Sequence, residues 1–224
     1  MKLVEFTTKF EKMGIVPVFF HAIRVDMPVR AVFRRLGYHK GRTEISKAQL
    51  AEVEAAFQDA VPLIELKGSA VLVSVKEQDE GHIVLATGEF LQSASLARML
   101  YGSSEVLFMG ATAGNVIMEE IGRESKQGRL SRAVVLDAVA SEMTDKALDW
   151  ITGHMGRELR RQGKGVTRSR FSAGYGDFAL ENQKIMYELL QLQNIGVKIT
   201  DSCILIPEKS VTAIAGVRIG EFKQ

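Results

Sequence analysis

Arg170-Phe171-Ser172-Ala173-Gly174-Tyr175 is the stretch of the 224-residue sequence from which the fold can be worked out. Arginine can hold a carboxylate with two parallel hydrogen bonds, and this one stands in a predicted loop rather than on a solvated helix face. Gly174 permits a positive φ or a close approach to a ligand, and Tyr175 offers a flat face with a polar tip. These residue types suit an amino-acid carboxylate attached to a flat heteroaromatic group. A purely structural turn is the alternative.

The segments on either side of this stretch predict regular structure. Upstream, a long helix is predicted from about Ser131 to Arg161, with a buried stripe that Gly163 and Gly165 bring to an end. Downstream, the pattern predicts a helix over residues 180–193, a strand over 197–206 that Pro207 stops, and an alternating strand over 211–219. The two strands are close enough in sequence to be antiparallel neighbours.

The long helix also carries a polar face. Asp137, Ser141, Asp145 and Asp149 follow at intervals of four residues, which places three carboxylates and a hydroxyl along one side. Such a run is usually a solvated face, and that is the expectation from this pattern alone.

The first half of the chain mixes helices and strands. Helices are predicted over residues 26–37, over 46–61 from a capping box at Ser46 and Gln49, over 93–101 and over 115–121. A β-hairpin is predicted from the runs 70–75 and 82–86, and a buried strand at 105–109. We therefore expect one compact α+β domain over residues 1–224. A division near residues 88–92, with a small N-terminal subdomain 1–88, is the alternative.

Composition excludes several classes of protein. The 29 basic and 27 acidic residues leave a net charge of +2, which predicts no strong attraction to nucleic acid or to an anionic membrane. The single cysteine, Cys203, excludes an internal disulfide and a four-thiolate iron–sulfur cluster. Residues 1–6 have no export signal and no apolar run is long enough to span a bilayer, so we expect a cytoplasmic protein.

Other candidate motifs favour structural interpretations. The loop Gly110–Gly114 lacks phosphate-loop spacing, and we expect a tight turn with Thr112 or Asn115 capping the next helix. Cys203 is expected inside a strand as a small core residue. The four histidines, His21, His39, His82 and His154, are not spaced as metal ligands. The basic stretch from Arg157 to Arg170 has few aromatic neighbours, and nucleic-acid binding is only a third candidate function.

Two ordered blocks carry a family resemblance. Residues 170–175 resemble the R-x-x-x-G-Y signature of the activation domain of cobalamin-dependent methionine synthase, which in that family contacts S-adenosylmethionine. Thr200-Asp201-Ser202, Pro207 and Ser210-Val211-Thr212 are similar to the T-E-S, P and S-V-S positions of the same domain. Weaker likenesses to short, separately encoded members lie at residues 34–38, 111–114 and 137–141. The resemblance implies a mostly antiparallel sheet with flanking helices.

The resemblance also implies a function. An activation domain holds S-adenosylmethionine as methyl donor while oxidised cobalamin on a methyltransferase is reduced by an external donor and remethylated. Arg170, Gly174 and Tyr175 would then contact S-adenosylmethionine, with Asp145, or failing that Glu142, as the carboxylate from the long helix. The chain has no D-x-H-x-x-G motif, so cobalamin would arrive on a partner corrinoid protein or methyltransferase. Any enzyme activity would be that of a component of methionine synthase.

Two departures from the family pattern favour an alternative function. Ile214-Ala215 stands where the family has an aromatic pair, and residues 16–20 lack the acidic residue of the D-W-x-P-F-F run. The alternative is a non-catalytic module that docks on a corrinoid protein or senses a metabolite and has lost S-adenosylmethionine binding.

Overall fold

The computed structural model describes residues 10, 13–38 and 41–220. The predictions on residues 1–6 and on His39 lie outside these residues. Within them, a sheet of seven strands forms the centre of the molecule, in the order β4-β3-β2-β5-β9-β6, with β1 paired to the first part of β2. Every pairing in it is antiparallel. Its strands are β1 (Val18–Phe20), β2 (Lys67–Gln78), β3 (His82–Leu85), β4 (Phe90–Gln92), β5 (Glu105–Thr112), β6 (Lys164–Val166) and β9 (Ser210–Ile219).

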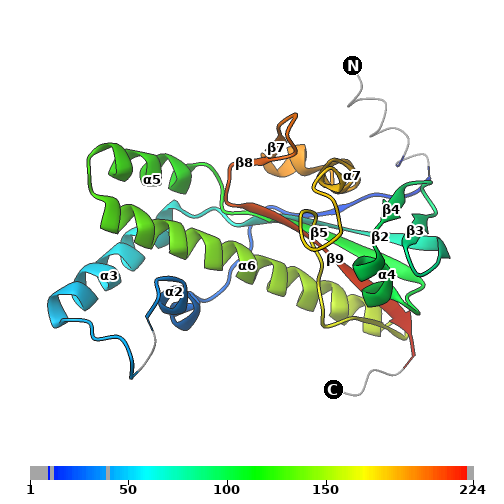
Figure 1. Cartoon of the computed structure of the whole chain (residues 1–224), viewed down its shortest axis with the longest axis horizontal. Helices are drawn as coiled ribbons and strands as arrows, with labels where there is room; N and C mark the ends of the chain where they lie inside the picture. The colour runs from blue at the N-terminus through cyan, green and yellow to red at the C-terminus, as the bar shows by residue number, and fades with distance from the viewer. Residues whose placement is uncertain (1–9, 11–12, 39–40, 221–224) are drawn as a thin grey trace.

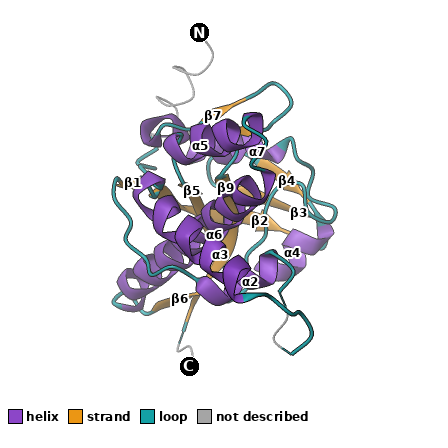
Figure 2. Ribbon diagram, turned by 90° about the vertical axis from the view of Figure 1, so that its left-hand side faces the viewer, coloured by secondary structure: helices purple, strands orange, loops and turns teal. Residues whose placement is uncertain are grey.

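Helices cover both faces of this sheet. On one face the long helix α6 packs against β5 and is flanked by α2, α3 and α5, whereas α4 and α7 lie on the other side (Figures 1 and 2). The helices are α2 (Val29–Arg35), α3 (Lys47–Ala60), α4 (Ala94–Leu100), α5 (Val116–Lys126), α6 (Leu130–Arg160) and α7 (Asn182–Leu189), with short 3-10 turns at η1 (Val61–Leu63) and η2 (Leu192–Ile195).

Two hydrophobic cores result from this arrangement. Side chains alternate across a strand, so Leu107 and Met109 of β5 pack with α6, while Val106 and Phe108 pack with α4 and α7. The four side chains are fully buried. A central strand buried on both faces reads as a continuous apolar run, which is how residues 105–109 read in the sequence. The predicted α+β class and single compact arrangement are confirmed.

Most predicted helices are confirmed with their end signals. The Ser46 hydroxyl accepts from the Gln49 N–H at 3.2 Å, and the Gln49 side chain accepts from the Ser46 N–H at 3.0 Å, so the capping box forms. Ser93 caps α4 by accepting from the Leu96 N–H. The long helix occupies residues 130–160, within one residue of the prediction.

Four local predictions are wrong. Residues 197–206 form a small hairpin, β7 (Lys198–Ile199) with β8 (Leu205–Ile206), and β9 pairs with β5 and β6 instead of with this segment. The predicted loop at residues 110–114 is strand β5 as far as Thr112. The side chain of Asn115 does not cap α5, and Thr112 accepts from the Gly114 N–H instead. The helix predicted over 180–193 is shorter and ends in a 3-10 turn.

Among the described helices, none combines the length and apolarity that a bilayer crossing requires.

Candidate ligand site

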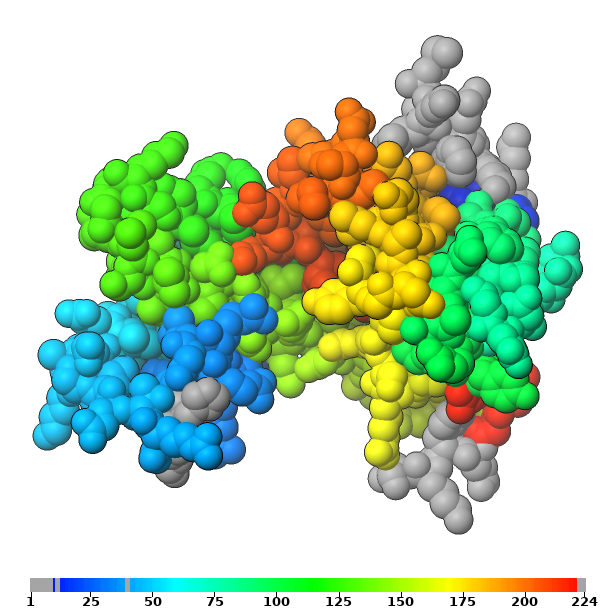
Figure 3. Space-filling view, in the orientation of Figure 1, coloured from blue at the N-terminus to red at the C-terminus, as the bar shows by residue number. Residues whose placement is uncertain are grey.

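A pocket of about 550 Å³ opens between α6 and the C-terminal third of the chain. In Figure 3 it is the hollow where β9 comes to the surface between α6 and the segments that carry residues 170–206. Its size is within the range of small-molecule sites. The residues that line it are Asp145, Leu148, Arg170, Phe171, Ser172, Ala173, Tyr175, Leu180, Gln183, Cys203, Ile204, Leu205, Glu208, Ser210, Val211, Thr212 and Ala213.

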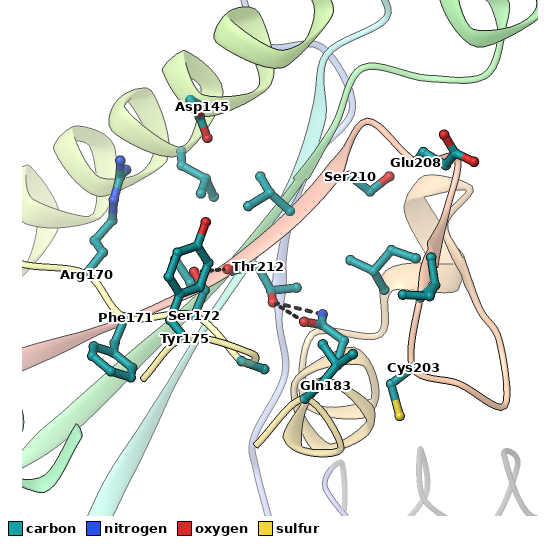
Figure 4. Close-up of a pocket in the computed structure, with 17 residues that line it drawn as sticks. Asp145, Arg170, Phe171, Ser172, Tyr175, Gln183, Cys203, Glu208, Ser210 and Thr212 are labelled. Carbon is teal, nitrogen blue, oxygen red and sulfur yellow. Dashed lines mark hydrogen bonds between the residues drawn. The ribbon is translucent and has the colours of Figure 1, made fainter. Parts of the chain in front are cut away.

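The loop that contains Arg170 is fixed to the edge of β9. The Phe171 N–H donates to the Ile214 carbonyl at 2.9 Å, the Ile214 N–H donates back at 2.7 Å, and the Ser172 hydroxyl donates to the Thr212 carbonyl at 2.7 Å. Arg170 therefore extends from a braced backbone toward α6, where its Nη2 lies 3.0 Å from Oδ1 of Asp149 (Figure 4).

The turn that follows presents Tyr175 at the pocket mouth. Gly174 has a φ of +86°, a conformation that favours glycine, and its N–H donates to the Phe178 carbonyl. Tyr175 lines the pocket and is 70% exposed, so its ring is available to a ligand or to a partner. Gly174 is not among the lining residues, and its part is to shape the turn.

Asp177 anchors the far end of the same loop. Its carboxylate accepts from the Ser93 hydroxyl at 2.6 Å and from the N–H groups of Ala94 and Ser95, at the start of α4. The hydrogen bond from Ser93, followed by those from Ser95 and Ala94, lowers the pKa of Asp177 to about 2. The Arg170–Asp177 loop is thus held at both ends.

The expectation of a solvated face on α6 holds in part: its three carboxylates are about half exposed, and each also contacts a basic residue of another segment. Asp149 pairs with Arg170, and Asp137 pairs with Lys209 at 2.7 Å. From α2, Arg35 reaches Glu142 at 2.6 Å.

Asp145, which lies between these pairs, is only weakly paired, with Arg35. Its contact with Arg35 is 3.5 Å long, its side chain is 51% exposed, and it lines the pocket. Burial is the main cause that raises the pKa of Asp145, and Glu142 and Asp149 also raise it, while Arg35 and Arg170 act in the opposite direction. Glu142, the second choice from sequence, is occupied by Arg35 and is not a lining residue.

A hydrogen-bonded pair, Gln183 and Thr212, lines the floor of the pocket, and Gln183 was not predicted from the sequence. Gln183 of α7 is 6% exposed, and its Nε2 donates to Oγ1 of Thr212 at 2.8 Å while its Oε1 lies 3.1 Å from the same hydroxyl. Gln183 shares the buried face of α7 with Met186, and with Leu190 just after the end of the helix; a polar residue at that helical spacing was the available signal.

Of the second block of the resemblance, Ser210, Val211 and Thr212 line the pocket, whereas residues 200–202 and Pro207 do not. The Thr200 hydroxyl lies 2.9 Å from that of Ser202 and accepts from the Ile204 N–H, so this segment is a turn. Cys203 is in that turn with a φ of +67°, not in a strand as predicted, and it is a buried lining residue. Ile214 and Ala215 are fully buried in β9, so neither reaches the pocket.

In the described part of the chain no group of three or more His, Cys, Asp or Glu residues could hold a metal ion. Members of the basic stretch are spread over separate partners: Arg161 with Glu158, Lys164 with Glu105, and Arg170 with Asp149.

Comparison with known proteins identifies the architecture. No family model and no curated protein sequence matches the chain. Among solved structures, the chain matches the crystal structure of the MetH reactivation domain bound to AdoHcy with a TM-score of 0.64. The fold is that of the MetH reactivation domain. Sequence identity is 12%, and the match covers 94% of this chain and 80% of the other. The fold implied by the two sequence blocks is therefore confirmed, and the reactivation-domain architecture extends over nearly the whole chain.

Proposed function

We propose that this protein binds S-adenosylmethionine in the pocket beside α6 and supplies it for the remethylation of cobalamin carried by a partner methyltransferase. One observation carries the proposal. Three of the four residues chosen from sequence line the same pocket: Asp145 of α6, and Arg170 and Tyr175 of the loop between β6 and α7. The pocket lies in a fold shared with a domain whose crystal structure holds AdoHcy, the demethylated relative of this ligand.

Each residue has a defined part in this proposal. Arg170 pairs with the methionyl carboxylate, and its braced loop limits the conformational entropy lost on binding. Asp145 pairs with the α-ammonium group, for which its weakly paired carboxylate is suited. Tyr175 packs on the ligand from the mouth, and Gly174 gives the turn its shape. Gln183 and Thr212 offer polar atoms at the floor.

The chemistry needs no acid or base from this chain. When bound, S-adenosylmethionine supplies a methyl group that is already activated as a sulfonium. The residues of the pocket contribute orientation and exclusion of water. Cobalamin and its reductant belong to other proteins in this proposal, which makes the chain a component of a cytoplasmic methionine synthase system.

The mouth of the pocket supports docking of such a partner. Tyr175, Leu180 and Ile204 are 70%, 37% and 47% exposed and all line the opening. Exposed apolar side chains gathered at the rim of a pocket are typical of a surface that a second protein covers. The docking unit we propose is the whole chain, residues 1–224, because Arg35 from the N-terminal part contacts Asp145 of the pocket.

Calorimetric titration with S-adenosylmethionine tests the proposal. We expect saturable binding by the wild type and a loss of at least about tenfold in Arg170→Ala, the scale of a charge-assisted bidentate pair. Arg168→Ala is the matched control, since Arg168 is an exposed arginine two residues away that does not line the pocket. No heat at millimolar ligand would sink the proposal. Retained binding to a corrinoid protein in that case would establish the docking or metabolite-sensing module instead.

A further inference from the structure

The charged groups that line the pocket are not balanced. Asp145 and Glu208 are carboxylates, and Arg170 is the only basic residue among the lining set. The charge of Arg170 is in turn opposed by Asp149 at 3.0 Å. Arg35 likewise contacts Asp145 at 3.5 Å. With these two neighbours counted, three carboxylates face two guanidinium groups, so a ligand in this pocket meets an excess of negative charge.

Glu208 is held at the rim by its neighbour. Lys209 is mostly buried and pairs with Asp137 of α6 at 2.7 Å, while its carbonyl accepts from the Ala113 N–H at 2.8 Å. The next residue, Ser210, starts β9 and donates to the Thr112 hydroxyl at 2.9 Å. With residue 209 fixed against α6, Glu208 is left at the opening, across the pocket from Asp145 (Figure 4). Sequence reasoning passed over this residue.

We infer that the site selects its ligand by charge, taking the sulfonium cation in preference to the neutral thioether that remains after methyl transfer, and that Glu208 is a specificity-determining residue for this choice. The inference rests on the proposed function. S-adenosylmethionine carries a carboxylate, an ammonium and a sulfonium, for a net charge of +1. Once the methyl group has passed to a nucleophile, both sulfur electrons stay on the thioether and the molecule has no net charge.

A site of this kind releases its demethylated product more readily than its methyl donor. The attraction between one additional positive charge and carboxylates in a partly open pocket corresponds to an affinity difference on the order of tenfold. The demethylated molecule keeps its contacts with Arg170 and Asp145 but loses this attraction, so it leaves faster than the methyl donor does.

Three ligands separate charge from shape: S-adenosylmethionine, S-adenosylhomocysteine and sinefungin, in which a carbon bearing an ammonium group replaces the methylated sulfur. By calorimetry at pH 7.5, we expect S-adenosylmethionine and sinefungin to bind about equally and S-adenosylhomocysteine roughly tenfold more weakly. In Glu208→Gln, the ratio of the affinity for S-adenosylmethionine to that for S-adenosylhomocysteine should fall at least about threefold, mainly because the two cationic ligands bind more weakly. Added salt should reduce the difference in affinity between the cationic and the neutral ligands in the wild type, because it screens the charges.

The control is Glu181→Gln, which removes an exposed carboxylate next to α7 that does not line the pocket and should leave the ratio unchanged. Equal binding of the charged and neutral ligands by the wild type would overturn charge selection while leaving the proposed function standing. An unchanged ratio in Glu208→Gln would overturn the assignment of Glu208. Absence of binding for all three ligands would overturn the proposed function itself. A melting temperature of Glu208→Gln close to that of the wild type shows that the variant is folded.

Discussion

Asp149 of α6 holds the guanidinium of Arg170 at 3.0 Å, one helical turn beyond Asp145. Both partners are partly exposed, so the pair contributes little to stability, about 1 kcal/mol or less. Its effect should appear in binding. We expect Asp149→Asn to weaken S-adenosylmethionine binding about two- to fivefold, less than Arg170→Ala does, because Arg170 loses its preset orientation. Calorimetry on the variants measures this. Tighter binding by Asp149→Asn would show instead that Asp149 competes with the ligand carboxylate.

Asp177 provides a test of loop anchoring. Asp177→Ala removes the acceptor for Ser93, Ala94 and Ser95, and we expect the melting temperature to fall by roughly 2–4 °C, as for loss of one helix cap. Amide hydrogen exchange should increase at residues 174–178 as well as at the start of α4. Faster exchange in α4 alone would mean that the loop is held by its contacts with β9.

The pair formed by Glu124 and Arg129 should make the free energy of unfolding depend on pH in the acid range. Hydrogen bonds from Arg129, at 2.5 and 2.8 Å, are the main cause that lowers the pKa of Glu124 from 4.5 to about 2. A lowered folded-state pKa means that the stabilisation is present above about pH 4.5 and is lost as the pH falls toward 2. Urea unfolding between pH 6 and 2 should therefore show a flatter acid limb for Glu124→Gln than for the wild type. Glu54→Gln, at an exposed position of α3, should keep the wild-type slope.

Two glycines predict opposite effects of the same substitution. A Cβ on Gly68 in β2 would lie 2.5 Å from Cδ1 of Ile151 and 3.0 Å from the Gly110 carbonyl oxygen, so Gly68→Ala should destabilise by about 1–3 kcal/mol. Gly122 lies inside α5 with nothing within 4 Å of that position, and Gly122→Ala should stabilise by roughly 0.5–1 kcal/mol. Urea unfolding measures both, and a stabilised Gly68→Ala would show that α6 can move away from the sheet.

Cys203 offers a chemical readout of pocket occupancy. It is the only cysteine of the chain and it lines the pocket while being 5% exposed. We expect saturating S-adenosylmethionine to slow its reaction with a thiol reagent several-fold, since the ligand covers the opening. Arg170→Ala at the same ligand concentration should show no protection. If Cys203 reacts at the same rate with and without ligand, at a ligand concentration that calorimetry shows to be saturating, the ligand binds elsewhere.

How far the sequence predicts this molecule depends on the length of each signal. The long helix, the capping box at Ser46 and the β2–β3 hairpin were predictable because periodicity and caps repeat over many residues. The three-residue strands β1, β4 and β6 give no periodic signal, and pairing with longer strands is what makes them extended.

The candidate site was predictable where two distant blocks agreed. Residues 170–175 were placed in the loop that they form. The segment 197–206 was misjudged because its apolar residues outweighed Thr200-Asp201-Ser202, a composition typical of turns. Gln183 and Glu208 were missed because their position depends on tertiary packing: on Thr212 for the first, and on the Lys209–Asp137 pair for the second.

Strand β9 lies between β5 and β6 although it follows both in the chain. During synthesis, α6 and the first five strands of the sheet leave the ribosome with the exposed edge of β5 still unpaired. Closure of the sheet must then join residues about one hundred positions apart, which makes folding slow and leaves an edge open to misassociation. The pocket walls at residues 170–173 and 210–213 come together in that same step. A ribosome-bound chain that has not yet released residue 219 would therefore be unable to bind ligand, however complete its helices are.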